Sequence, residues 1–331
     1  MKNRSGTRFS AWRCGCAVVL TCTLFSFGLL LAAQETEYYP GKLRIEKARN
    51  LSPEERVVEA RFAAYLEAHT EQAMARYRGK FGKEINTDNA RELSSDYAPG
   101  GIEAEDPATV AARTKWSSAV FEPASAVAKE LYSRALKQKT SPGGSKMVVF
   151  TAGGAGVGKT TVLRQSANFT RAVEMADFVY DTTLSSFRSA MERISRALDS
   201  GRTVNIIFVY RDPVDAFVGG LLPRAKKTGR ILPVEAFLTT HLGAVQEIQK
   251  IRDANKNDSR VAIAIVDNRG ALHQPMVSDF EFVKAMARKY SRDALRKSLL
   301  GALEIAHEKG KSGDPEGISE AVYLAVKGRA P

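Results

Sequence analysis

The sequence predicts an α/β fold in which helices cover both faces of a parallel sheet, with helical extensions before and after this core. Short apolar runs alternate with helical segments from Met147 to Val266, which is typical of a parallel sheet packed between helices. Apolar residues recur at helical spacing on both sides of that region. The chain has 331 residues, 44% hydrophobic and 26% charged. These values exclude wholesale disorder, collagen and a polytopic membrane protein, and indicate about two domains of ~150 residues or one large domain.

Residues 1–33 are predicted to be a signal peptide or a membrane anchor. Basic residues precede an uncharged run from Cys14 to Ala33, which ends in small residues, as secretory signals do. The run is also close to the ~20 residues that span a bilayer, so an uncleaved anchor is the rival interpretation. We therefore expect a protein that is exported or membrane-anchored through residues 14–33, and cytoplasmic if the start codon is misassigned. All three cysteines lie in this run, so the rest of the chain cannot form a disulfide.

Residues 34–140 are expected to form a helical region. A capping box at Ser52 predicts the start of a helix that runs to about Arg78. A loop is expected from Ala98 onward. A second helix is expected over residues 124–136.

Residues 141–270 form the predicted core. Strands are expected over residues 147–150, 178–180, 204–210 and 261–266, and helices after the first strand and over residues 187–198 and 234–252. The remaining residues, 271–331, are predicted to be a C-terminal helical extension with two or three helices between Asp279 and Val326.

A glycine-rich segment follows the first core strand and fits the phosphate-loop pattern G-x-x-x-x-G-K-[ST]. Its residues, with the threonine after them, are Gly153, Gly154, Ala155, Gly156, Val157, Gly158, Lys159, Thr160 and Thr161. The glycines allow backbone N–H groups to point at phosphate oxygens. Lys159 should reach the β- and γ-phosphates, and the Thr160 hydroxyl should bind Mg²⁺. The fold is thus predicted to be a three-layer P-loop NTPase that uses ATP and Mg²⁺.

Further charged residues favour phosphoryl transfer. Asp181 ends the strand at 178–180, where a carboxylate would lie near the loop and its Mg²⁺; the alternative is a helix cap for the segment that starts at Leu184. Arg224 and Arg230 belong to a basic cluster that follows the third strand, where P-loop kinases carry a lid. The alternative is an ordinary basic surface loop. The net charge of +12 suits an anionic ligand such as a nucleotide, and no nucleic-acid partner is expected.

Two motifs typical of GTPases are also present, but in the wrong order and context. Residues 255–258 read N-K-x-D and follow a predicted helix rather than a strand. Residues 267–270 read D-x-x-G and come after them. We interpret the first as a solvated loop and the second as a turn at a strand end.

From about Gly79 to Gly270, the sequence resembles the zeta toxin family of P-loop kinases. Residues 153–161 resemble the ATP loop of that family, residues 179–183 its acid-Gly-Thr strand end with Thr182 in place of glycine, and Arg224 and Arg230 its two lid arginines. The resemblance implies a kinase that phosphorylates a hydroxyl of a UDP-N-acetylsugar. The family's catalytic D-x-x-R-like segment follows the ATP loop, whereas residues 85–93, which look like it here, precede the loop.

The expected catalytic residues are Asp88, Lys159, Arg224 and Arg230. Asp88, Arg91 and Asp181 are expected to contact the acceptor, and Thr160 and Asp181 the metal. The alternative for Asp88 is a plain helix N-cap. The predicted enzyme is a phosphotransferase with an alcohol group as acceptor. The alternative function is an ATP-binding or ATP-hydrolysing switch without a phosphoacceptor. An antitoxin-like protein is a candidate partner.

Overall fold

We describe the protein from a computed structural model, which describes residues 37–39, 41, 43–139, 145–269 and 275–328. The apolar segment at residues 14–33 lies outside these residues, so its role as a signal or anchor stays a prediction. Among the described residues, no helix combines the length and apolar character that crossing a bilayer requires.

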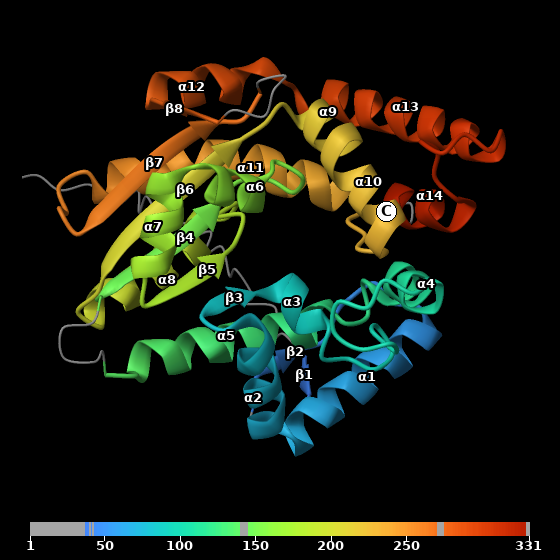
Figure 1. Cartoon of the computed structure of the whole chain (residues 1–331), viewed down its shortest axis with the longest axis horizontal. Helices are drawn as coiled ribbons and strands as arrows, with labels where there is room; N and C mark the ends of the chain where they lie inside the picture. Colours follow the sequence, from blue (N-terminus) through green and yellow to red (C-terminus); the bar gives the residue numbers. More distant parts are fainter. Residues whose placement is uncertain (1–36, 40, 42, 140–144, 270–274, 329–331) are drawn as a thin grey trace, which may run out of the picture. The chain divides into compact units, whose positions relative to one another are not determined.

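A mostly parallel sheet forms the centre of the fold, as the alternation of strands and helices predicted. Its six strands lie in the order β3–β5–β4–β6–β7–β8, and only β8 is antiparallel to its neighbour (Figure 1). In that order the strands are Glu84–Asn86, Phe178–Asp181, Met147–Ala152, Thr203–Tyr210, Val261–Asp267 and Met276–Ser278. The three-residue strands β3 and β8 were not predicted, because neither is a continuous apolar run like residues 178–180.

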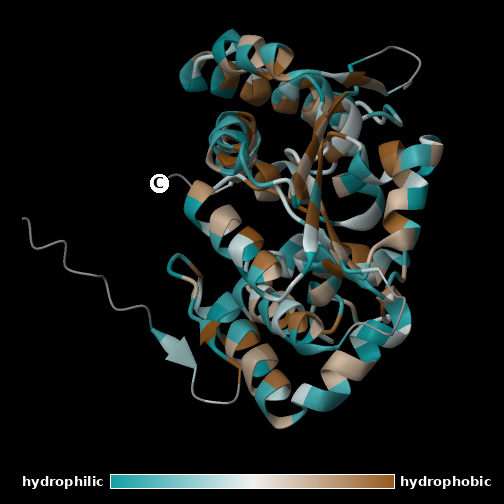
Figure 2. Cartoon of the chain, turned by 90° about the vertical axis from the view of Figure 1, so that its left-hand side faces the viewer, coloured by the Kyte–Doolittle hydropathy of each residue, from teal (hydrophilic) through white to brown (hydrophobic). Residues whose placement is uncertain are grey.

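Two apolar cores lie on opposite faces of this sheet, because successive side chains of a strand point to opposite faces. Val148 and Phe150 of β4 belong to one core and Val149 to the other. The first core includes residues of α5 (Phe121–Lys137) and α8 (Phe187–Asp199). The second includes residues of α6 (Lys159–Gln165), α13 (Arg292–Lys311) and α14 (Glu320–Lys327). Apolar residues follow the central strands in Figure 2. Helices on both faces are therefore confirmed.

The N-terminal region differs from the prediction in several places. The single helix expected from Ser52 to Arg78 is two helices, α1 (Pro53–Ala68) and α2 (Thr70–Phe81). They separate at His69, where the Thr70 hydroxyl donates to the Leu66 carbonyl at 2.7 Å and so competes with the backbone N–H for that acceptor. The expected loop after Ala98 contains helix α4 (Pro107–Trp116), which Asp106 caps. A two-stranded hairpin of β1 (Tyr38–Tyr39) and β2 (Ile45–Glu46) precedes α1.

Strand β3 joins this N-terminal region to the central sheet. It pairs parallel with β5, and Asn86 lies opposite Asp181 in the register. Helix α3 (Thr87–Arg91) follows it directly. Because the carboxyl ends of parallel strands meet at one edge of a sheet, α3 starts at the edge where the phosphate loop leaves β4.

The segment after β6 is helical from Pro213 to Thr228, whereas residues 229–233, which include Arg230, lie outside any helix. It comprises α9 (Pro213–Ala216), the π-helical turn η1 (Phe217–Leu221) and α10 (Leu222–Thr228). We call η1 and α10, together with residues 229–233, the lid segment. Helix α11 (Val234–Asn255) returns along the sheet. The other elements are α7 (Ala167–Met175) and α12 (Phe280–Lys289), and α12 with α13 and α14 confirms the expected C-terminal helices.

Candidate active site

The phosphate loop occupies the predicted turn between β4 and α6. Its glycines are required by backbone geometry, since Gly156 and Gly158 have φ of 73° and 86°, values that residues with a Cβ rarely adopt. A Cβ on Gly156 would also lie 2.3 Å from the Ala216 carbonyl oxygen. Thr160 and Thr161 are exposed in the first turn of α6. The two threonines predicted to bind the nucleotide are thus accessible. The loop that precedes them has no space for a side chain at its glycines.

Two side chains from other elements hold this loop in place. The Asn268 side-chain amide, just after β7, donates to the Val157 carbonyl at 2.7 Å. His241 of α11 is buried against the loop, because a Cβ on Gly154 would lie 2.4 Å from its Nδ1 atom. Its Nε2 atom lies 3.1 Å from the Arg211 carbonyl oxygen. Burial lowers the pKa of His241 to about 4, so this ring is neutral near pH 7.

Asp181 lies beside Lys159 and ties the phosphate loop to β3. The Lys159 Nζ atom is 3.5 Å from Asp181 Oδ1 and donates to the Gly153 carbonyl at 3.2 Å. The Thr151 hydroxyl donates to Asp181 Oδ1 at 2.5 Å. The Asn86 amide donates to Oδ2 at 2.7 Å. The helix-cap alternative for Asp181 is wrong, because α8 begins after Ser186 and has no side-chain cap.

Asp88 lies in the first turn of α3, two residues beyond β3. The N-cap alternative for Asp88 is also wrong: Asn86 is the cap, and its side chain accepts from the Asp88 N–H at 2.7 Å. The Asp88 carboxylate instead accepts from Arg224 of α10 at 2.8 Å, with 36% of its side chain exposed. Residues 136 positions apart in the sequence are thereby brought together.

Arginines surround Asp88. Arg91 approaches its Oδ1 atom at 3.7 Å. Burial alone would raise the pKa of Asp88, but the guanidinium groups of Arg91, Arg224 and Arg230 hold that pKa well below its ordinary value. The Arg91 side chain is buried, donates to the Ser117 hydroxyl at 3.1 Å and lies over the Phe121 ring. Arg91 is therefore mainly a support for Asp88, with little surface left for an acceptor.

Arg230 is held by a buried carboxylate that the sequence did not single out. Glu92 accepts from Arg230 at 3.0 Å and from Arg113 at 2.6 Å. Its side chain is 0% exposed. Asp88 and Glu92 together raise the pKa of Arg230 against the effect of burial, which lowers it. We call the following residues the Asp88 cluster: Asp88, Arg91, Glu92, Arg113, Arg224 and Arg230.

The supporting residues Asn86, Glu92, Arg113, His241 and Asn268 were not predicted as site residues. Asn86 and Asn268 could have been found, since each ends or follows a strand at the edge where the phosphate loop lies. Glu92 stands beside Arg91 in the segment that resembles the family. Nothing local to Arg113 or His241 distinguishes them from surface residues of a helix.

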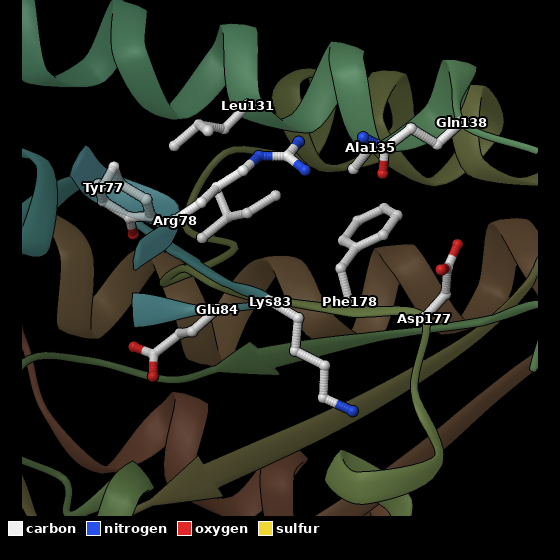
Figure 3. Close-up of a pocket in the computed structure, with 11 residues that line it drawn as sticks. Tyr77, Arg78, Lys83, Glu84, Leu131, Ala135, Gln138, Asp177 and Phe178 are labelled. Atoms are coloured by element: carbon white, nitrogen blue, oxygen red, sulfur yellow. The ribbon is translucent and has the colours of Figure 1, made fainter. Parts of the chain in front are cut away.

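A pocket of about 270 Å³ lies at the other end of the same strands. It is lined by Lys83 and Glu84 at the start of β3 and by Asp177 and Phe178 at the start of β5. Figure 3 shows the side chains of Arg78, Leu131 and Phe178 converging there. Because Asp88 and Asp181 lie at the opposite strand ends, this pocket is separate from the candidate active site.

The sequence model of the zeta toxin family matches residues 166–275, about a third of the chain. The match includes Asp181 and both lid arginines. It begins after the phosphate loop, and it leaves out the segment around Asp88, which precedes that loop. The zeta toxin resemblance is thus confirmed for residues 166–270 of the predicted core. No curated protein gives a significant match to the sequence.

Solved structures of AvrRxo1-ORF1 with AvrRxo1-ORF2 are similar to the chain at low identity. The complex with ATP has 12% identity and a TM-score of 0.40, covering 59% of this chain and 81% of that chain. The native complex has 12% identity and a TM-score of 0.42, covering 70% and 95%. The complex with sulphate ions has 13% identity and a TM-score of 0.43, covering 71% and 98%.

Proposed function

We propose that the protein is an ATP-dependent phosphotransferase of zeta toxin type that transfers the γ-phosphate to a hydroxyl of an anionic metabolite such as a UDP-N-acetylsugar. One observation carries this proposal. A continuous series of side-chain contacts runs from Lys159 through Asp181 to Asn86, and two residues later Asp88 meets Arg224. A phosphate loop, a carboxylate and a lid arginine therefore meet at one edge of the sheet, as phosphoryl transfer requires.

The nucleotide half of the site fits ATP and Mg²⁺. The loop N–H groups and Lys159 would hold the β- and γ-phosphates. Mg²⁺ prefers hydroxyl, carboxylate and water oxygens and keeps few protein ligands, and the exposed Thr160 hydroxyl and the Asp181 carboxylate supply that donor set. Among the described residues no group of three or more His, Cys, Asp or Glu could hold a metal. When bound, the ion would neutralise negative charge on the phosphates.

On the acceptor side, Asp88 would accept a hydrogen bond from the attacking hydroxyl. Its lowered pKa keeps it ionised near pH 7, so it acts chiefly by orienting the oxygen. This suffices where the transition state is loose and positioning dominates catalysis. Arg224 and Arg230 would offset the negative charge on the group in transfer.

The charge of the Asp88 cluster supports an anionic acceptor. Its four guanidinium groups outnumber its two carboxylates, and Arg224 is 42% exposed. An acceptor that carries a diphosphate would match this excess of positive charge. The resemblance alone supports an antitoxin-like partner.

Turnover of ATP with and without acceptors tests the proposal. The purified chain is incubated with Mg²⁺ and ATP, first alone, then with a panel of UDP-sugars and other nucleotides, then with metabolite extract. Mass spectrometry should find a product heavier than its acceptor by one phosphate. ATP turnover that ignores every acceptor would favour the switch module instead.

A further inference from the structure

Glu92 is a fully buried carboxylate between the N-terminal region and the lid segment. One of its oxygens, Oε1, accepts from Arg230 at 3.0 Å, and the other, Oε2, accepts from Arg113 at 2.6 Å. Oε2 also accepts from the Glu103 backbone N–H at 3.2 Å. A buried carboxylate is costly unless all of its oxygens are paired, and here each oxygen has a guanidinium.

Arg113 connects Glu92 to helix α4. This side chain, in α4, is 2% exposed and donates to the Ala104 carbonyl at 2.5 Å. The end of the lid segment packs on the same helix, because a Cβ on Gly229 would lie 2.1 Å from the Val110 carbonyl oxygen. Arg113 of α4 therefore fixes the position of Glu92 independently of Arg230.

We propose that Glu92 is the positioning residue for Arg230, holding its guanidinium toward the transferred phosphate; this rests on the proposed function. Glu92 takes a single N–H group, at Nη2, out of the five that a guanidinium offers. The remaining donors stay available beside Asp88. Without Glu92, Arg230 would be free to move toward the Asp88 carboxylate, which already accepts from Arg224, and to occupy a further lone pair that the acceptor hydroxyl needs. A preorganised charge of this kind acts on the transition state and not on nucleotide binding.

A double-mutant cycle with Glu92→Gln and Arg230→Ala tests this positioning role. We expect each single variant to lower kcat for transfer by ~10-fold or more, with KM for ATP within about twofold of wild type. The double variant should be no slower than Arg230→Ala, because Glu92 acts through Arg230. The matched control is Glu59→Gln, since Glu59 is also 0% exposed and also pairs with an arginine, Arg56, at 2.8 Å, but lies outside the cluster. It should leave kcat unchanged.

Hydrogen exchange on the chain without nucleotide provides a readout that does not depend on activity. In Glu92→Gln, amides of residues 224–232 should exchange faster, whereas those of the phosphate loop should not change. Glu59→Gln should leave both segments as in wild type. If Glu92→Gln does not fold, Glu92→Gln with Arg113→Gln removes one buried charge of each sign and takes its place.

The outcomes separate this proposal from the proposed function. Unchanged lid exchange in Glu92→Gln, or effects of Glu92→Gln and Arg230→Ala on kcat that multiply, would overturn the role of Glu92. A wild-type chain that phosphorylates no acceptor would overturn the proposed function, while the exchange experiment would still decide whether Glu92 holds the lid segment.

Discussion

The phosphate loop and the Asp88 cluster are assembled in different ways. The loop is a contiguous run of residues 153–161 whose shape comes from its own glycines. The cluster draws its residues from α3, α4 and the lid segment, and its longest contact joins positions 138 residues apart. The loop therefore depends on backbone geometry, and the cluster depends on tertiary packing and paired charges. This difference predicts which changes affect nucleotide binding and which affect transfer alone.

The largest effect is expected for Lys159→Ala, which removes the side chain that should reach the β- and γ-phosphates. Turnover should fall ~10³-fold or more, and ATP affinity should fall with it, while the melting temperature stays close to wild type. Calorimetric titration of ATP and a thermal melt check both halves of this prediction. Lys146→Ala, an exposed lysine just before β4, is the control. Wild-type ATP affinity in Lys159→Ala would contradict the assignment of the loop.

Asp88→Asn should impair the function of the Asp88 cluster without impairing that of the phosphate loop. The variant keeps the shape of the side chain but removes the charge that orients the acceptor, so transfer should fall ~10²-fold with ATP affinity retained. Initial rates at saturating ATP measure it. Asp96→Asn breaks an ion pair with Arg61 at 2.6 Å outside the cluster and should be silent. Retained transfer in Asp88→Asn would leave the position of this segment before the ATP loop without a functional explanation.

The contrast between the two regions also explains how far the sequence alone could predict the site. The position of the loop between a strand and a helix was predicted, because its motif, strand and helix are consecutive. Strand β3 was not predicted, since its three residues form a strand only by pairing with β5, about 95 positions away. Asp88 was found only through a family resemblance. Helix α4 was missed although Asp106 and Pro107 form a good helix start. Glu92 and Arg113 could not be recognised, because their role exists only once α3, α4 and the lid segment have packed.

A smaller effect is expected for Asn268→Ala, which tests whether β7 supports the phosphate loop. The variant leaves the buried Val157 carbonyl without its donor, which costs ~1–3 kcal/mol. We expect ATP affinity to fall ~10-fold, with the ratio of transfer to ATP bound unchanged. Asn255→Ala is the control, because this amide also donates to a buried carbonyl, that of Ile251 at 2.7 Å, away from the loop. A loss of transfer without a loss of affinity would assign Asn268 to the cluster instead.

The smallest effect is the contribution of His241, beneath the phosphate loop, to the pH dependence of stability. Burial lowers the pKa of His241 from 6.5 to about 4, so between these values the unfolded chain binds a proton that the folded chain does not. Stability from this group is therefore fully present above pH 6.5 and is lost as pH falls toward 4. Between pH 7 and pH 5.5 the loss is about 1 kcal/mol.

Urea unfolding of wild type and His241→Gln at both pH values should show a pH dependence of the free energy of unfolding that is smaller in the variant by this amount. Asp88 should add nothing over this range, because its pKa lies far below it. Asp88→Asn should accordingly lose the same stability on acidification as wild type. An equal pH dependence in wild type and His241→Gln would mean that the ring is not held neutral beneath the loop.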